Sequence, residues 1–400
     1  MDVAVVGGGM VGASFALALA GTPLSIAVVE GFAPDSRAQP SFDERTTALG
    51  NASRRIFEAL GIWQRIVAEA SFIRAIHVSD AGRFGFARLD AREQGIEAFG
   101  YVVANRAIGT ALWERLSASP RVTLRVPAKL ESLDIAASEV RLGIDGGGTL
   151  EALSARLVVA ADGAQSKVRQ AAGIESRVKD YGQVALVSNV RADQPHDGTA
   201  YERFTSAGPM ALLPLYDGSY TAVWARTREQ AEAALRLDDA AYLQALQVAF
   251  GWRAGRFLEV GRRASYPLAL SRASAAVGPR AVLIGNAAQS LHPVAGQGFN
   301  LGLRDAAVLA EVLARHGGDP GSPEVLAQFA VERAADRRGV TGFTDGLVRL
   351  FGDSGTAVGF ARDIGLLLFD LTPPAKSALA RVSTGFGGRA PRLARGLRLT

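Results

Sequence analysis

The strongest constraint on the fold lies at the start of the sequence, where a cluster of glycines separates an apolar strand from an apolar helix. The run Val3–Val29 contains no charged residue, so its hydropathy also fits a membrane span or a signal peptide. Only Met1 and Asp2 precede this run, which gives no positively charged n-region, and glycines and Pro23 interrupt it. We therefore expect a strand, a turn, a helix and a second strand of a folded domain.

The glycine cluster matches the pattern G-x-G-x-x-G at Gly7, Gly9 and Gly12. The strand VAVV precedes it, a helix follows, and the next strand ends at Glu30, which is the context of a dinucleotide-binding turn. Gly7 permits the tight turn, Gly9 lets the backbone approach a pyrophosphate, and Gly12 lets helix and strand pack closely. The helix N-terminus favours the phosphates, and the spacing of Glu30 suits ribose hydroxyls. A structural glycine turn is the weaker alternative.

A second strand-turn-helix unit follows in the middle of the chain. Leu157–Ala161 is an apolar strand, Asp162 and Gly163 form a turn, and Ser166 is a candidate N-cap of the next helix. Taken alone, this unit is an ordinary strand-to-helix junction of an α/β domain.

A second glycine-rich loop, SLHPVAGQGFNLGLRD at residues 290–305, follows the apolar strand Ala281–Gly285. The helix after this loop has one apolar face, formed by Leu303, Ala306, Ala307, Ala310, Leu313 and Ala314. Gly298 and its neighbours would place free backbone N–H groups at the start of that helix. FAD has two polar ends, a pyrophosphate and a ring that becomes an anion when reduced, so one ligand explains both loops.

Between residues 181 and 267, short alternating runs replace the strand-helix units, and MALLPLYDGSYTAVWAR reads as a hairpin with its turn at Asp217-Gly218. Residues 76–97 also contain strand-like pieces. We predict an α/β protein with a Rossmann-type FAD-binding domain, an inserted antiparallel-sheet substrate domain and C-terminal helices. The expected division is residues 1–75, 98–180 and 272–335 for the FAD-binding domain, 76–97 and 181–271 for the sheet domain, and 336–400 for a helical region with a basic tail.

Composition excludes several classes of site. The chain has no cysteine and only four histidines, which removes disulfides, thiolate zinc sites and dithiol relays and predicts no metal site. The net charge of +5 comes with no nucleic-acid motif, so we expect no nucleic-acid partner. From Arg381 to Thr400 there are five arginines and no acidic residue. This tail is read either as solvated and partly disordered or as attracted to anionic lipid headgroups.

The loop SLHPVAGQGFNLGLRD closely resembles the signature of the ubiquinone-biosynthesis flavoprotein monooxygenases, the UbiH/UbiF group. The resemblance covers most of the chain, including DERTTALGNASRRIFEALGIW, GYVVANRAIGTALWERL, AADGAQSKVR, AYERFTSAGPMALLPL and TDGLVRLF. It implies the hydroxybenzoate-hydroxylase fold, with FAD as cofactor and no separate nicotinamide domain. Many relatives carry GDAAH where this chain has GNAAQ (Gly285–Gln289). The Asn/Gln form resembles the UbiH branch, which hydroxylates 2-polyprenyl-6-methoxyphenol.

The resemblance assigns cofactor contacts residue by residue. Arg45 is matched to the arginine along the ribityl-pyrophosphate, Asn105 to a polar cofactor contact, and the turn Asp162-Gly163 to a position near FAD and the passing nicotinamide. Asn286 is matched to the position beside the ribityl chain. The residues that border the flavin ring, largely through backbone, are Pro293, Gly296, Gln297, Gly298 and Asn300.

The same resemblance implies the reaction. NAD(P)H or another electron donor reduces FAD, the reduced flavin adds O2 to give a hydroperoxide, and the phenol ring attacks the distal oxygen. His292, beside Pro293, is the candidate catalytic base by position, and support of the loop is the alternative role. Pro209 and Trp224 are candidates for lining the substrate side. A tryptophan in a strand is more often part of the core.

Two rival functions stay open on the sequence alone: a hydroxylase of a small soluble phenol on the same fold, and a non-catalytic flavin-loaded subunit of a ubiquinone-biosynthesis complex. The predicted substrate is a polyprenylated phenol, together with O2. Residues 363–379 and the arginines after them are candidates for contact with the membrane surface, which would place a cytoplasmic protein peripherally at the inner membrane. Self-association stays undecided.

Overall fold

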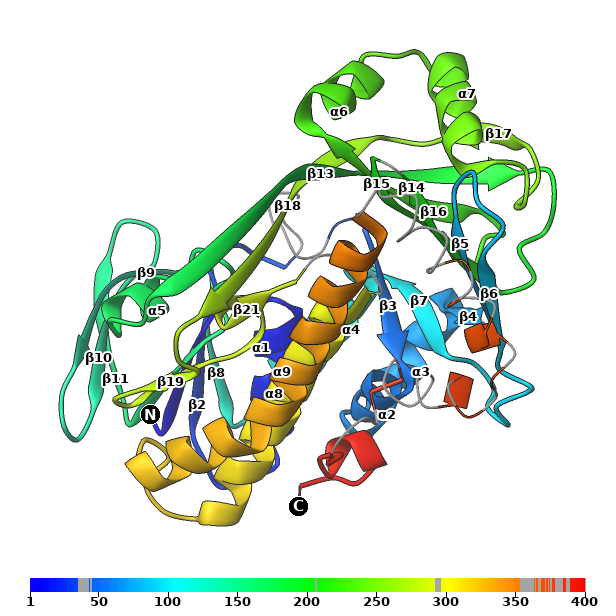
Figure 1. Ribbon diagram of the computed structural model, residues 1–400. Coiled ribbons are helices and arrows are strands. Elements are labelled where there is room, and N and C mark those ends of the chain that lie inside the picture. Colours follow the sequence, from blue (N-terminus) through cyan, green and yellow to red (C-terminus); the bar gives the residue numbers. More distant parts are fainter. Residues whose placement is uncertain are drawn as a thin grey trace.

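The computed structural model describes most of the chain, and the description below is confined to those residues (Figure 1). They are residues 1–34, 43, 45–205, 207–291, 296–352, 363, 365, 368–370, 372, 374, 376–377, 384–385 and 389–399.

The first of the two large sheets of the molecule has six strands. Its strands lie in the order β19 (Val277–Gly278), β20 (Ala281–Leu283), β12 (Leu157–Ala160), β1 (Val3–Val6), β2 (Ile26–Val29) and β8 (Val122–Arg125). Every neighbouring pair is parallel except β19 and β20. Strands buried on both faces are continuous apolar runs, which is why VAVV and IAVV form strands here.

Layers cover both faces of this sheet. Val3 and Val5 point to one face, against the helices α1 (Met10–Leu19), α4 (Asn105–Ser117), α8 (Gln297–His316) and α9 (Pro323–Gly352). Ala4 and Val6 point to the other face, because successive side chains of a strand alternate. That face is covered by α5 (Lys167–Ala171) and by a three-stranded sheet of β9 (Lys129–Ile135), β10 (Val140–Asp145) and β11 (Leu150–Ala155).

The second large sheet is mostly antiparallel. Its main path runs β21 (Gln289–Ser290), β18 (Ala264–Ala273), β13 (Ser176–Ala192), β16 (Tyr220–Thr227), β15 (Gly208–Pro214), β14 (Thr199–Thr205), β5 (Ala75–Asp80) and β6 (Phe86–Asp90), and β17 (Phe257–Val260) pairs with β13. The predicted hairpin at Asp217-Gly218 is confirmed as β15 and β16, and β5 joins β14 in parallel. Helices α6 (Arg228–Leu235) and α7 (Asp239–Phe250) cover the outer face (Figure 1).

Smaller elements complete the fold. A three-stranded sheet of β3 (Thr46–Gly50), β7 (Gly100–Ala104) and β4 (Ser71–Ile73) lies beside α2 (Asn51–Ala59), α3 (Trp63–Ile66) and the 3-10 turn η1 (Val67–Glu69). The end of the chain contributes the 3-10 turn η4 (Leu393–Arg395), which packs on α2. Leu393 and Ala394 are buried, and the backbone N–H of Arg392 donates to Glu311 at 2.7 Å. Residues 389–399 are therefore packed against the protein, which corrects the expectation of a disordered tail there.

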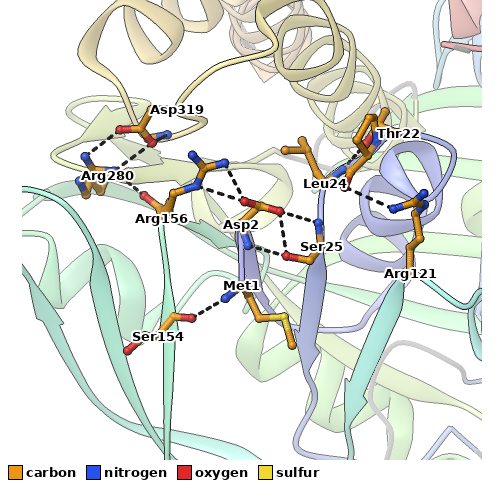
Figure 2. A network of polar contacts seen from close by, with 12 residues as sticks. Met1, Asp2, Thr22, Leu24, Ser25, Arg121, Ser154, Arg156, Arg280 and Asp319 are labelled. Carbon is orange, nitrogen blue, oxygen red and sulfur yellow. Dashed lines mark hydrogen bonds and ion pairs between the residues drawn. The ribbon is translucent and has the colours of Figure 1, made fainter.

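The amino-terminal edge of the parallel sheet is closed by ion pairs (Figure 2). Asp2 lies just before β1 and accepts from Arg156, just before β12, at 2.7 Å. Arg280, just before β20, pairs with Asp319 at 2.8 Å. Since polar side chains and the chain terminus occupy this edge, the opposite edge, where the parallel strands end, is the one left for a ligand.

Four of the predicted domain boundaries fall inside continuous elements, those at 75/76 in β5, 180/181 in β13, 271/272 in β18 and 335/336 in α9. Of these elements, β13 runs on into the second sheet. The division into domains stays a prediction. Within the described residues, no helix combines the length and the apolar composition that crossing a membrane would require.

Candidate functional site

A cleft of about 780 Å³ opens where the strands of the parallel sheet end, and it is called the cofactor cleft below. Its walls come from segments that are far apart in the sequence: the first glycine loop, the end of β2, the turn after β12, the turn after β20 and the start of α8. Ligand sites of open α/β sheets lie at this edge, and the volume is within the usual range for a cofactor site.

The glycine loop leaves no room for side chains. A Cβ atom on Gly7 would lie 2.4 Å from the carbonyl oxygen of Ala161, and one on Gly12 would lie 2.0 Å from the carbonyl oxygen of Gly7. Gly7 also has a φ of +100°, which strongly favours glycine. Gly7 and Gly9 line the cofactor cleft, whereas Gly12 does not and serves the close packing of α1 against the loop. No acidic residue lies in the first turn of α1, so its N-terminus is open to an anion.

Glu30 holds the glycine loop as well as lining the cleft. One carboxylate oxygen accepts from the backbone N–H of Gly8 at 2.6 Å, and the other accepts from Phe32 at 2.9 Å. The indole N–H of Trp113 donates to the carbonyl of Gly8 at 2.9 Å, and a Cβ on Gly8 would lie 2.7 Å from the Trp113 ring. Gly8 and Trp113 were not among the predicted site residues, although the middle glycine of GGG is a visible signal of crowding.

Asp162 supplies a carboxylate with unused hydrogen-bonding capacity. Its Oδ2 accepts from the backbone N–H of Val168 at 3.3 Å, while its buried Oδ1 has no partner among the described residues. Burial raises the pKa of Asp162, and hydrogen bonds from Ser166 and Val168 offset only part of that rise. An orphaned carboxylate oxygen in the wall of a cleft is satisfied when a ligand hydroxyl donates to it.

Arg45 and Asn105 reach the cleft from a different part of the chain. Arg45 pairs with Asp43 at 2.6 Å and lies 4.6 Å above the ring of Tyr266. Asn105 begins α4 and accepts from the hydroxyl of Thr47 at 2.6 Å. Both residues line the cofactor cleft, as does Gly163, which has a φ of +86°.

The second glycine loop places a helix start at the other end of the cleft. Gly296 caps α8 in the left-handed conformation, with φ of +57°, and no acidic residue lies in the first turn of α8. Gly296, Gly298 and the exposed Asn286 line the cleft, while Gln297 does not. The structure therefore brings two helix N-termini to one cleft, as the two loops predicted.

Asn300 is expected to border the flavin ring largely through its backbone, and that role stays a prediction. Its side chain does not line the cleft and instead makes four hydrogen bonds within the protein. It accepts from the backbone of Gly50 at 2.8 Å and from Ser53 at 2.6 Å, and it donates to the carbonyls of Ala48 and Gly296, each at 2.8 Å. Because all the hydrogen-bonding capacity of this side chain is used, Asn300 fixes the position of the Gly296 loop and its amide has no group left for a ligand.

A second, apolar pocket of about 140 Å³ adjoins the cofactor cleft. Four residues line both spaces: Ala48, Leu213, Val223 and Gly296. The remaining walls come mainly from the inner face of the second large sheet and include Pro209, whose role on the substrate side stays a prediction.

Trp224 does not line this apolar pocket, which corrects the prediction. It lies on the outer face of the sheet, packs edge-on against Tyr242 of α7 at 6.1 Å between ring centres, and is part of the core there. The reason is strand alternation, since Val223 and Ala225, its neighbours in β16, are the residues that face the pocket.

Glu202 is the one acidic residue among the described residues that line the apolar pocket. It is partly buried by surface area, and no described residue hydrogen-bonds to its carboxyl group or forms an ion pair with it. Burial in these apolar surroundings raises the pKa of Glu202 to about 8. Glu202 lies in the motif AYERFTSAGPMALLPL and was not among the predicted site residues. The signal was present, because Glu202 lies two residues from the apolar Ala200 and from the apolar Phe204 and so shares their face of the strand.

The raised pKa of Glu202 predicts that the free energy of unfolding depends on pH. Its pKa is about 8 in the folded protein against an ordinary 4.5, so in this window the folded state holds a proton that the unfolded state has lost. The free energy of unfolding therefore falls as pH rises, by up to about 1.4 kcal/mol per pH unit, until Glu202 ionises in the folded state. Because glutamine does not ionise, we expect the free energy of unfolding of Glu202→Gln to lack this fall with pH. Urea denaturation of both FAD-saturated proteins at about pH 5, 7 and 9 measures the difference, and a difference that does not change with pH would contradict the prediction.

His292 and Pro293 lie outside the described residues, so their predicted roles stay predictions. Among the residues that are described, no group of three or more His, Asp or Glu side chains is arranged to hold a metal ion.

Comparison with known proteins shows the family of the chain. Residues 1–344 match the family described as FAD binding domain. The ubiquinone hydroxylase UbiL of Rhodospirillum rubrum is 38% identical over 100% of this chain and 93% of its own length. The chain belongs to the FAD-dependent monooxygenases of ubiquinone biosynthesis. The 3-demethoxyubiquinol 3-hydroxylase of Escherichia coli strain K12 is 34% identical over 92% of this chain and 94% of its own.

The fold of this flavoprotein monooxygenase is shared more widely. The crystal structure of p-nitrophenol 4-monooxygenase PnpA from Pseudomonas putida superposes with a TM-score of 0.79, covering 97% of this chain and 98% of that one at 22% identity. The residues of the cofactor cleft fit FAD: the glycine cradle, the orphaned oxygen of Asp162 and two helix N-termini without acidic residues suit a ligand with hydroxyls and two polar ends. Bound FAD supplies the redox chemistry of the monooxygenase.

Proposed function

We propose that this chain hydroxylates the aromatic ring of a polyprenylated phenol, with 2-polyprenyl-6-methoxyphenol as the substrate and NAD(P)H as the electron donor. The observation that carries the proposal is the apolar pocket that shares Ala48, Leu213, Val223 and Gly296 with the cofactor cleft. A ring held there lies beside the end of the cofactor cleft at which α8 starts. The resemblance to the family places the flavin ring at that end.

The volume of the apolar pocket supports an aromatic ring as its occupant. Dry apolar cavities of roughly 150 Å³ bind benzene, and this pocket of about 140 Å³ is walled by side chains such as Ile73, Ile76 and Leu268. A polyprenyl tail exceeds that space, so it extends out of the pocket toward the bilayer in our proposal. The protein would then work peripherally at the membrane surface.

The ring position rests on the segment Gly285–Gln289. Asn286 lies in the wall of the cofactor cleft, where the GDAAH relatives have a carboxylate. An uncharged amide there avoids repulsion of a reduced, anionic flavin, and the Asn/Gln form resembles the UbiH branch. The Escherichia coli relative is named a 3-demethoxyubiquinol 3-hydroxylase, so that substrate is the runner-up.

The protein's own contribution to this chemistry is positioning and the exclusion of water. Asn300 fixes the Gly296 loop, which forms a wall of both spaces, and Pro209 and Leu213 present a rigid strand to the ring. Apolar walls keep water from the reacting atoms, and a confined ring meets the reactive oxygen at a high effective concentration.

The test is deletion of the gene in its host and identification of the prenylated lipid that accumulates. Accumulation of 2-polyprenyl-6-methoxyphenol, reversed by the wild-type gene but not by a glycine-loop variant without FAD, is the expected result. Accumulation of a different prenylphenol would keep the class of reaction and overturn the substrate. Turnover of a phenol without a tail at undiminished efficiency by the purified enzyme would overturn the requirement for a prenyl group.

A further inference from the structure

The apolar pocket contains one group that a purely apolar ligand would not need. Glu202 comes from β14, opposite Ala211 of β15 and Val78 of β5, and its surroundings in the pocket are apolar. A carboxyl group in such a place lowers the stability of the fold unless something pairs with it. Buried polar groups without partners concentrate at sites where a ligand supplies the partner.

The side chains next to Glu202 in sequence do not share its environment. Tyr201 packs edge-on against Phe250 of α7, with ring centres 5.5 Å apart, and Arg203 donates to the hydroxyl of Ser79 at 3.5 Å. Alternation along β14 therefore sends the side chains of Tyr201 and Arg203 toward the outer face and that of Glu202 toward the pocket, although Tyr201 also borders the pocket. The position of Glu202 is fixed by the register of a central strand, which is bonded on both sides.

We propose that Glu202 is the general base of the hydroxylation, which accepts the hydroxyl proton of the phenol held in the apolar pocket. The geometry that supports this role is a carboxyl group with no partner among the described residues, on the wall of a ring-sized pocket that adjoins the cofactor cleft. The inference rests on the proposed function, because it needs a phenol as the substrate.

The step balances without a further reagent. The phenol O–H bond breaks, the proton binds to a carboxylate oxygen of Glu202, and the electron pair stays on the phenol oxygen and delocalises into the ring. This raises the electron density at the ring carbon that receives oxygen. The dienone formed by oxygen transfer regains aromaticity by moving the proton of that ring carbon to the phenol oxygen. The proton on Glu202 enters the water that every monooxygenase reaction releases, which returns the carboxylate.

The raised pKa of Glu202, about 8, suits this role. A base is most effective when its pKa lies near the working pH, and an ordinary carboxylate is too weak to take a proton from a phenol. Of the other described residues that line the pocket, only Tyr201 is titratable, and its hydroxyl lies near the carbonyl of Arg253. Farther along β5, Asp80 pairs with Arg83 at 3.6 Å. The pH dependence of the step is therefore assigned to Glu202.

The first experiment compares wild type with Glu202→Gln, Glu202→Asp and, as a matched control, Glu232→Gln, an exposed residue of α6. The substrate is a short-chain 2-prenyl-6-methoxyphenol, and product is measured in a single turnover of reduced, FAD-loaded enzyme mixed with O2. The wild-type rate should rise with pH up to about 8. Glu202→Gln should lose this rise and be slower on the order of 100-fold, with peroxide released instead of product. Glu202→Asp should restore part of the rate, and Glu232→Gln should match wild type.

A binding measurement separates this role from a structural one. Oxidised, FAD-loaded protein is titrated with the same phenol and with its O-methyl ether, and binding is followed by the change in flavin absorbance. Glu202→Gln should weaken phenol binding at high pH about tenfold, the effect of losing one charge-assisted hydrogen bond. Binding of the ether, which has no proton to give, should not change.

Equal rates and pH profiles for Glu202→Gln and wild type would overturn the role of Glu202. If wild type fails to hydroxylate this phenol, the proposed function fails, and the phenol-against-ether comparison still decides whether Glu202 recognises a phenol hydroxyl. Equal weakening of phenol and ether by Glu202→Gln would mean a structural role and would also overturn the proposal.

Discussion

Replacing Gly12 with valine is expected to abolish tight binding of FAD. A Cβ atom at this position would lie 2.0 Å from the carbonyl oxygen of Gly7 and 3.0 Å from the Cβ of Ala161. The first of these contacts is backbone, so α1 must move away from the loop that is expected to hold the phosphates of FAD. Overpacking costs about 1–3 kcal/mol or more, and each 1.4 kcal/mol that falls on binding is roughly tenfold in affinity. We expect FAD affinity to fall at least about 100-fold.

The measurement is the FAD content of the purified protein, followed by titration of the apoprotein with FAD and detection by quenching of flavin fluorescence. Gly339→Ala is the matched control, because Gly339 lies exposed in α9 and a Cβ there meets nothing within 4 Å. That variant should bind FAD as wild type does and be equally stable or more stable. Gly12→Ala tests the same contact with a smaller side chain if the valine variant does not fold. Stoichiometric FAD in both Gly12 variants would contradict the assignment of this loop.

Those parts of the fold that depend on local patterns could be predicted from the sequence. The apolar run VAVV, the turn at Asp217-Gly218 and the N-cap at Ser166 each carry their cause in a few adjacent residues, and each has the predicted structure. Residues 76–97 contain strand-like pieces and were predicted to belong to the second sheet. This prediction is confirmed, since β5 and β6 both lie in that sheet.

The direction of single side chains was harder to predict. Asn300 lies in the motif that the resemblance to the family places beside the flavin ring, and its side-chain amide is used by Gly50, Ser53, Ala48 and Gly296. Three of these partners lie about 250 positions away, so no local pattern reveals that the amide is fully used. For Trp224, strand alternation leaves two choices of face, and the choice depends on α7 covering the outer side. Motif membership places the backbone near a ligand, but not each side chain.

The charged residues that join α8 to α9 were not predictable from the sequence, and they give the second large effect. Asp305 is fully buried and accepts from Arg333 at 2.7 Å and from Arg337 at 2.9 Å, residues on the other helix. Asp336 pairs with Arg304 and Arg333. Burial alone would raise the pKa of Asp336, but the two guanidinium groups hold it below its ordinary value. The five side chains form one buried network.

Asp305→Asn is expected to lower the free energy of unfolding by about 3–5 kcal/mol, because it leaves the three arginines of the network with Asp336 as their one carboxylate within it. Arg333 is 3% exposed, so water cannot replace the lost carboxylate. Denaturation by urea, with FAD at the same saturating concentration for each protein, measures the loss. Glu114→Gln is the control, since Glu114 forms an ion pair with Arg65 in which both side chains are about half exposed. Breaking such a surface pair costs up to about 1 kcal/mol.

The same variant should also disturb the cofactor cleft. Asp305 accepts a hydrogen bond from the backbone N–H of Gly285 at 3.3 Å, and Gly285 begins the turn that carries Asn286 into the wall of the cleft. We therefore expect Asp305→Asn to weaken FAD binding as well as the fold, whereas Glu114→Gln leaves both unchanged. A loss of stability below about 1 kcal/mol would mean that the network contributes no more than a surface pair. The start of α8 would then be held mainly by its apolar face, through residues such as Leu303 and Leu309.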